Sequence, residues 1–134
     1  MKHRFDTRHL PALILSFLLL GFPILVQAET GDPQRIEMRA GGPARIIKGE
    51  IRGRKEVVYV FKARAGQKFS GRIKRQTGDA SFAVTDPDGA ALPEEEFDVN
   101  ISLRGSLKKS GDYKITINTV NSQDSKYSLS VRVY

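Results

Sequence analysis

The stretch "EVVYVFKARAGQKFSGRIKR" (Glu56–Arg75) decides the fold class of this 134-residue chain. Its first eight residues contain a run of five that is apolar on both sides, which is typical of a strand inside a sheet. "AGQ" then supplies Gly66 for a turn, and in "KFSGRIKR" apolar or small residues alternate with Lys, Ser and Arg. The stretch therefore predicts two strands joined by a tight turn.

The same period of two continues on both sides of this stretch. It occurs in "ARIIKGEIRG", "ASFAVTDPDG", "FDVNISLRGSL", "DYKITIN" and "KYSLSVRVY", and each of these runs is predicted to contain one strand. The long segment "AALPEEEF" is predicted to cross from one sheet to the other. The chain is thus predicted to be all-β, with about seven or eight short strands in an antiparallel two-sheet β-sandwich.

The first 28 residues have the features of a secretory signal peptide. "MKHRFDTRH" carries Lys2, Arg4 and Arg8, the 19 residues of "LPALILSFLLLGFPILVQA" contain no charge, and "VQA" has a small-x-small cleavage pattern. A run of this length is also about long enough to span a bilayer, so retention as a membrane anchor stays open beside cleavage. Cleavage would make the protein periplasmic or secreted, with no membrane span.

Residues 29–134 are predicted to form one small domain. Residues 29–43 read as a leader in which Ile36 and Met38 add an edge strand, and 44–134 as the β-sandwich. The chain contains no Cys, so no disulfide supports the core. Export without disulfides is more typical of bacteria than of small secreted eukaryotic domains.

The composition of residues 29–134 excludes several kinds of catalytic and metal site. Both histidines, His3 and His9, lie in the signal segment, and the chain has no Cys and no Trp. Zinc sites of Cys and His, haem ligation through His, thiol chemistry and the Ser-His-Asp triad are therefore excluded. Ser106 near Lys108 and Lys109 is the only conceivable nucleophile–base set, and no elbow motif accompanies it. We predict no enzyme activity and no cofactor.

Carboxylates are concentrated in residues 76–98, which hold 7 acidic and no basic side chains. The acidic residues are Asp79, Asp86, Asp88, Glu94, Glu95, Glu96 and Asp98. Ca²⁺ takes about six to eight converging oxygens, and "DPDG" is first a turn that is too short for a calcium loop. A glycosidase pair would need a cleft between its two carboxylates. We predict no metal site.

Several motifs within residues 44–134 resemble the bacterial pre-peptidase C-terminal domain. They are Tyr59 and Phe61 before Ala65-Gly66-Gln67, the hairpin Pro87-Asp88-Gly89, and Gly111-Asp112-Tyr113. This resemblance implies a jelly-roll-like β-sandwich. Its motifs are core and turn residues, so they imply a fold rather than an activity.

A stand-alone, signal-bearing chain with these elements is also similar to the periplasmic inhibitors of goose-type lysozyme. The shared segment "G-x-L…GDY" begins here at Gly105 and ends at Tyr113. The resemblance implies a non-catalytic binding module whose loops at one end of the sandwich block a muramidase cleft. We expect the partner-binding residues at that end to be Arg104, Ser106, Asn118 and Asn121.

One stretch departs from that inhibitor family. There, a longer and arginine-rich loop joins the last two strands, whereas the corresponding stretch here, "NTVNSQDSK", contains no Arg. Asn, Ser and Asp favour turns because they bond their own backbone. Whether residues 118–125 bind a partner or only connect two strands stays open.

Basic residues suggest an alternative function. Residues 35–75 hold 13 basic and 3 acidic side chains. The alternation places five of the basic residues on the outer sides of two strands: Lys48, Arg52, Lys68, Arg72 and Lys74. If those strands are neighbours, the patch suits an anionic envelope glycan, and no nucleic acid is predicted because aromatic residues for base stacking are missing. A solvated face that protects a sheet edge is the simpler interpretation.

Overall fold

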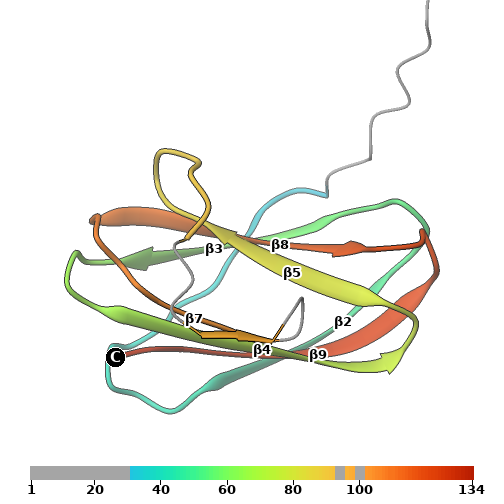
Figure 1. Cartoon of the computed structure of the whole chain (residues 1–134), viewed down its shortest axis with the longest axis horizontal. Helices are drawn as coiled ribbons and strands as arrows, with labels where there is room; N and C mark the ends of the chain where they lie inside the picture. The colour runs from blue at the N-terminus through green and yellow to red at the C-terminus, as the bar shows by residue number, and fades with distance from the viewer. Residues whose placement is uncertain (1–30, 93–95, 99–101) are drawn as a thin grey trace, which may run out of the picture.

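The computed structural model describes residues 31–92, 96–98 and 102–134, in which nine strands form two facing layers (Figure 1). The strands are β1 (Gln34–Arg35), β2 (Arg45–Ile51), β3 (Val57–Ala63), β4 (Lys68–Thr77), β5 (Ala80–Thr85), β6 (Glu96–Asp98), β7 (Ser102–Ser106), β8 (Gly111–Thr119) and β9 (Ser125–Val133). Within these ranges the structure has no helix, and so none that is long and apolar enough to cross a membrane.

The two sheets have the strand orders β1-β3-β8-β5 and β2-β9-β4-β7-β6. β1 runs parallel to β3, and the other strand pairs of the described residues are antiparallel. The predicted all-β, two-sheet sandwich is confirmed. The edge strand lies at Gln34–Arg35, just before the predicted Ile36 and Met38, although the Ile36 amide still donates to Val60 O at 2.9 Å.

The core lies between the sheets and is built from the inward residues of each alternating run. Phe61 of β3 stacks on Phe69 of the facing sheet, with 5.3 Å between ring centroids, and on Tyr113 of β8 at 5.5 Å. All three rings are fully buried. Because stacked rings add to the stabilisation from burial, this cluster joins the two sheets near the beginning of β4 and of β8.

The run 97–107 is not one strand, contrary to the prediction from alternation. β6 and β7 pair antiparallel, so the chain reverses between Asp98 and Ser102, and residues 99–101 lie outside the described part. Phe97 is opposite Leu103 in this pairing. Opposite residues of a pair share a face of the sheet. The period of two in the sequence therefore continues unchanged from β6 to β7, and the reversal cannot be seen in it.

The stretch between the last two strands is not a hairpin turn. β8 belongs to the four-stranded sheet and β9 to the five-stranded sheet, so residues 120–124 cross from one layer to the other. The predicted crossing after β5 is confirmed as well, because β5 and β6 also lie in different sheets. Residues 93–95 of that connection are outside the described ranges.

A buried tyrosine pair explains why β2 carries a glycine at its centre. The hydroxyl oxygens of Tyr59 and Tyr127 lie 3.1 Å apart across the sandwich, and burial together with this hydrogen bond raises the pKa of Tyr127. Gly49 is directly opposite Tyr127 in the β2–β9 pair. A Cβ on Gly49 would overlap the hydroxyl end of the Tyr127 ring, so only glycine leaves room for it.

Replacing Gly49 with Ala is expected to lower the free energy of unfolding by about 1–3 kcal/mol, because an extra methyl forces buried groups to move. Chemical denaturation measures the change. The control is the same substitution in a Tyr127→Leu background, where it should cost less than about 1 kcal/mol because the ring is gone. Equal costs in the two backgrounds would show that the Tyr127 ring does not exclude a side chain at Gly49.

Candidate protein-binding end of the sandwich

Three connections meet at one end of the sandwich, on the right in Figure 1. They are residues 52–56 between β2 and β3, residues 78–79 between β4 and β5, and residues 120–124 between β8 and β9. We call these three segments the loop end. They come from both sheets, and side-chain hydrogen bonds join them to one another.

Asp79 and Ser125 tie the 120–124 connection to the β4–β5 turn. Asp79 Oδ2 accepts a hydrogen bond from the Asn121 amide at 2.6 Å, and the buried Ser125 Oγ accepts one from the Asp79 amide at 2.9 Å. Gly78 has φ 74° and lies so close to Ser125 that a Cβ would overlap the hydroxyl. Glycine adopts this left-handed conformation without steric cost, so the sequence Gly78-Asp79 allows the close contact.

The β2–β3 turn holds the connection from the other side. The Gly53 amide donates to Asp124 Oδ1 at 2.9 Å, and Thr119 Oγ1 donates to Gly53 O at 2.8 Å. Arg54 Nε donates to Ser122 Oγ at 3.2 Å. Ser122 has φ 58°, a left-handed conformation that is uncommon outside glycine and persists where surrounding contacts impose it. The connection is therefore held in one shape by both neighbouring turns.

The outer surface of the loop end presents an apolar side chain, amides and guanidinium groups. Val120 is 60 % exposed, and Asn121 and Gln123 are exposed beside it. Arg54 is exposed, and Arg52 lies 3.5 Å from Glu50. The guanidinium that the 120–124 stretch itself lacks is thus supplied by a turn 68 residues earlier in the chain. No sequence pattern singles out Arg54, because its role depends on a contact between distant segments.

The four residues expected at one end of the sandwich are not brought together. Asn121 lies at the loop end, and Asn118 lies nearby on β8, where its Oδ1 accepts from Ser81 Oγ at 2.7 Å. Ser106 is opposite Lys68 at the other end of the sheet, and Arg104 is opposite Ser70 within β7. β7 extends away from the loop end, so the expectation of a single end for all four is wrong. A partner-binding role for each residue stays a prediction.

The five basic residues of the alternative site all lie on or beside strands of the five-stranded sheet. β2 and β4 are not neighbours, but both pair with β9, and Lys48 and Lys74 are opposite the same residue, Ser128. Arg72 lies two residues before Lys74 on β4, and Lys68 is the first residue of that strand. Arg52 lies beyond the end of β2, beside Glu50.

Three acidic residues of the 76–98 segment, Asp79, Asp86 and Asp88, hold turns together. Asp86 Oδ1 accepts from the amides of Asp88 and Ala90, and Lys109 Nζ contacts Asp86 Oδ2 at 2.8 Å and Asp88 Oδ2 at 2.6 Å. The bond from Lys109 holds the pKa of the Asp86 carboxyl below its usual value, and the same bond raises the pKa of Lys109. The Lys109 ammonium group is thus held by two carboxylates of the turn after β5. The described residues contain no group of three metal-ligating side chains, while Glu94 and Glu95 lie outside them.

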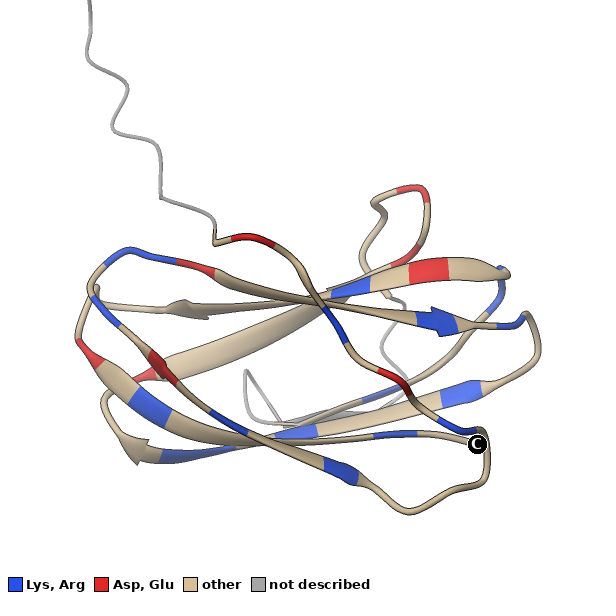
Figure 2. Ribbon diagram, turned by 180° about the vertical axis from the view of Figure 1, so that it is seen from behind, with Lys and Arg blue, Asp and Glu red and all other residues tan. Residues whose placement is uncertain are grey.

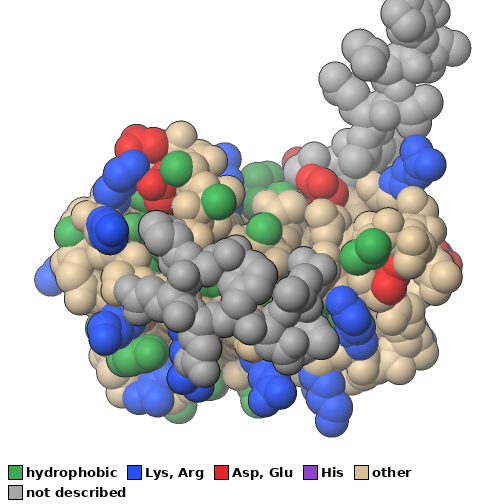
Figure 3. Space-filling view, viewed as in Figure 1, with side chains coloured by type: hydrophobic (Ala, Val, Ile, Leu, Met, Phe, Trp, Pro, Cys, Tyr) green, Lys and Arg blue, Asp and Glu red, His purple; other side chains and the backbone are tan. Residues whose placement is uncertain are grey.

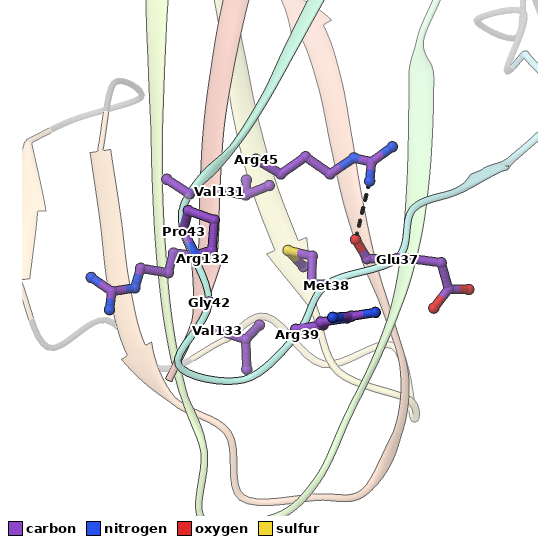
Figure 4. A pocket seen from close by; sticks show the side chains of 10 residues that line it. Glu37, Met38, Arg39, Gly42, Pro43, Arg45, Val131, Arg132 and Val133 are labelled. Atoms are coloured by element: carbon purple, nitrogen blue, oxygen red, sulfur yellow. Dashed lines mark hydrogen bonds between the residues drawn. The ribbon is translucent and has the colours of Figure 1, made fainter.

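A pocket of about 380 Å³ lies at the end of the sandwich opposite the loop end, where residues 37–45 pass over the end of β9. Met38, Val131 and Val133 contribute apolar lining, and Arg45 Nη1 donates to Glu37 O at 3.3 Å. Figure 4 shows Arg39 and Arg45 extending to one side and Arg132 to the other. Ligand pockets usually have a few converging polar groups, and these guanidinium groups do not converge.

Solved structures with this architecture include inhibitor proteins. The chain resembles Aeromonas hydrophila PliG, a periplasmic lysozyme inhibitor of g-type lysozyme, with a TM-score of 0.67 and 22 % identity over 81 % of this chain and 100 % of that one. Salmonella Typhimurium PliG, another such inhibitor, has a TM-score of 0.61 and 24 % identity over 78 % of this chain and 99 % of its own. The pre-peptidase C-terminal domain of Bacillus anthracis collagenase has a TM-score of 0.58 and 17 % identity over 79 % of this chain and 98 % of its own.

No protein-family model and no curated protein matches the sequence. The similarity to the solved structures, at 17–24 % identity, is a similarity of fold. It confirms the resemblance to both β-sandwich families that the core and turn motifs predict.

Proposed function

We propose that this protein is an exported, non-catalytic inhibitor that blocks the cleft of a goose-type lysozyme with its loop end. The observation that carries the proposal is the braced 120–124 connection, displayed at one end of a fold that two periplasmic inhibitors of g-type lysozyme share. Export rests on the signal features of residues 1–28.

The bracing favours tight binding for an entropic reason. Ordering a flexible loop on binding costs free energy, and a loop already held in its bound shape avoids most of that cost. The 120–124 connection accepts hydrogen bonds from Gly53 and Arg54 and donates one to Asp79. Such a loop can enter a cleft with little rearrangement, which is how most protease inhibitors bind.

The chemistry of the loop end suits a glycosidase cleft. Muramidases act with carboxyl groups, and an Arg guanidinium forms two parallel hydrogen bonds with a carboxylate. Arg54 supplies that group at the loop end, and Asn121 and Gln123 supply amides that hydrogen-bond in the manner of sugar hydroxyls. Val120 adds an exposed apolar contact. Arginine is also among the residues that most often dominate binding energy at interfaces.

Inhibition of purified goose-type, chicken-type and invertebrate-type lysozymes tests the proposal. Residues 29–134 contain all the described strands and are used without the signal segment. We expect inhibition of the goose-type enzyme at or below about 1 μM, with little effect on the other two. The assay uses both bacterial cells and a soluble oligosaccharide substrate, because inhibition seen with cells only would indicate binding to the cell wall. No inhibition of the goose-type enzyme with the soluble substrate would contradict the proposal.

A further inference from the structure

The outer face of the five-stranded sheet carries a cationic surface that the proposed inhibition does not use. Blue segments recur along the strands of this sheet in Figure 2, and blue side chains line the lower margin of the molecule in Figure 3. The outward residues of β2, β9 and β4 alternate with buried ones such as Leu129 and Ile73. We call the outward residues of these three strands the basic face.

Strand register arranges the basic face in rows. One row contains Lys48, Ser128 and Lys74, and the next contains Ile46, Ser130 and Arg72. Directly opposite residues point to the same side of a sheet, and adjacent strands lie about 4.8 Å apart. The half-buried serines of β9 therefore form a low polar floor between longer side chains on β2 and β4.

A hollow lies along the second half of β4. It has a volume of about 490 Å³ and is lined by Arg72, Ile73, Lys74 and Arg75. Arg75 is occupied, since its Nε donates to Ala80 O at 2.7 Å. Arg72 and Lys74 are exposed at the hollow. Two exposed cations of β4 thus lie at this hollow.

Three cations of the basic face differ in their ion pairing from other cations of the described residues. Arg35 contacts Asp112 at 2.7 Å and Lys109 contacts Asp86 at 2.8 Å. Over the ranges that the structure describes, Lys48, Arg72 and Lys74 form no ion pair. Exposed ion pairs add little to stability, so the fold does not need these three cations to be paired. They are therefore available to an outside anion.

We propose that the basic face binds an anionic polysaccharide, with its acidic groups at Lys48, Arg72 and Lys74 and its hydroxyls on the serine floor. Charge complementarity selects an anionic partner, and the hydroxyls of Ser128 and Ser130 suit the hydroxyl-rich backbone of a glycan. Bases of single-stranded nucleic acid stack on aromatic side chains, and none lies in these rows. A protein bound to a glycan through this face would keep its loop end exposed, because the loop end lies at the end of the sandwich.

Binding of dextran sulfate to residues 29–134, with neutral dextran as the uncharged reference, tests this inference. The variant Arg72→Gln/Lys74→Gln should lower the affinity for dextran sulfate at least about tenfold, because two cations of the site are lost. The matched control is Lys62→Gln/Lys114→Gln, which removes the same charge from β3 and β8 of the other sheet. Its affinity should change less than about threefold. Affinity of the unmodified protein should fall steeply as salt is added, because exposed charges are screened.

Three outcomes would overturn the inference. Equal losses in the two variants would show attraction by net charge alone. Tighter binding to a single-stranded oligonucleotide or to phosphatidylglycerol vesicles than to dextran sulfate would assign the face to another class of ligand. Absence of binding to dextran sulfate in low salt would show a solvated face without a ligand. Lysozyme inhibition is measured on the same variants and should be unchanged, so a failure here is separate from a failure of the inhibitor proposal.

Discussion

The Phe61→Ala protein is expected to lose about 3–5 kcal/mol of folding free energy, the range typical of removing a buried phenylalanine. Phe61 is fully buried and is the middle ring of the cluster with Phe69 and Tyr113. Its loss leaves a cavity between the two sheets and removes both ring contacts. The total free energy of unfolding of a small domain is only about 5–15 kcal/mol, so this substitution removes a large fraction of it.

Thermal denaturation followed by circular dichroism measures this loss, and the midpoint should fall by at least about 12 °C. Ile46→Ala is the control, because Ile46 is 66 % exposed on the outer face of β2. Its cost should be within about 0.5 kcal/mol. Similar costs for the two substitutions would mean that the ring cluster does not join the sheets.

The Arg54→Glu protein is expected to inhibit goose-type lysozyme about 100-fold less well, a loss typical of a residue that dominates an interface. Glutamate reverses the charge that would face the carboxyl groups of the cleft, and it also removes the hydrogen bond to Ser122. Inhibition constants with the soluble substrate measure the effect. Arg54→Lys keeps the charge without the planar fork, so its loss should be smaller, about tenfold.

Arg39→Glu is the matched control for Arg54→Glu. Arg39 is exposed and lines the pocket at the opposite end of the sandwich, so the change in net charge is the same at a different place. It should change the inhibition constant less than about threefold. Comparable losses for Arg39→Glu and Arg54→Glu would mean that overall charge, not the loop end, determines inhibition.

Much of the fold is predictable because alternation reports burial directly. Along β4, Phe69, Gly71 and Ile73 are inward and buried as the pattern predicts. The pattern contains no information about which strands pair, and so it could not show that β9 separates β2 from β4. It also could not show the reversal between β6 and β7, because antiparallel pairing kept Phe97 and Leu103 in phase.

The candidate site is less predictable because it depends on contacts between distant segments. The polar stretch 118–125 is conspicuous in sequence, but its bracing comes from Gly53, Arg54 and Asp79, which are far away along the chain. Arg104 precedes a motif shared with an inhibitor family and Ser106 lies within it, yet β7 runs away from the loop end. The basic residues were predictable as outward-facing, and pairing of β9 with both β2 and β4 is what places them on one surface.

Hydrogen–deuterium exchange of the protein, alone and with goose-type lysozyme, tests the central claim most directly. The loop end should become protected in the complex, with slower exchange in peptides that cover residues 52–56 and 120–124. Peptides of β4 and β9 on the basic face should exchange as in the free protein. Protection confined to the basic face, or no change at the loop end at saturating lysozyme, would contradict the claim that the loop end blocks the enzyme.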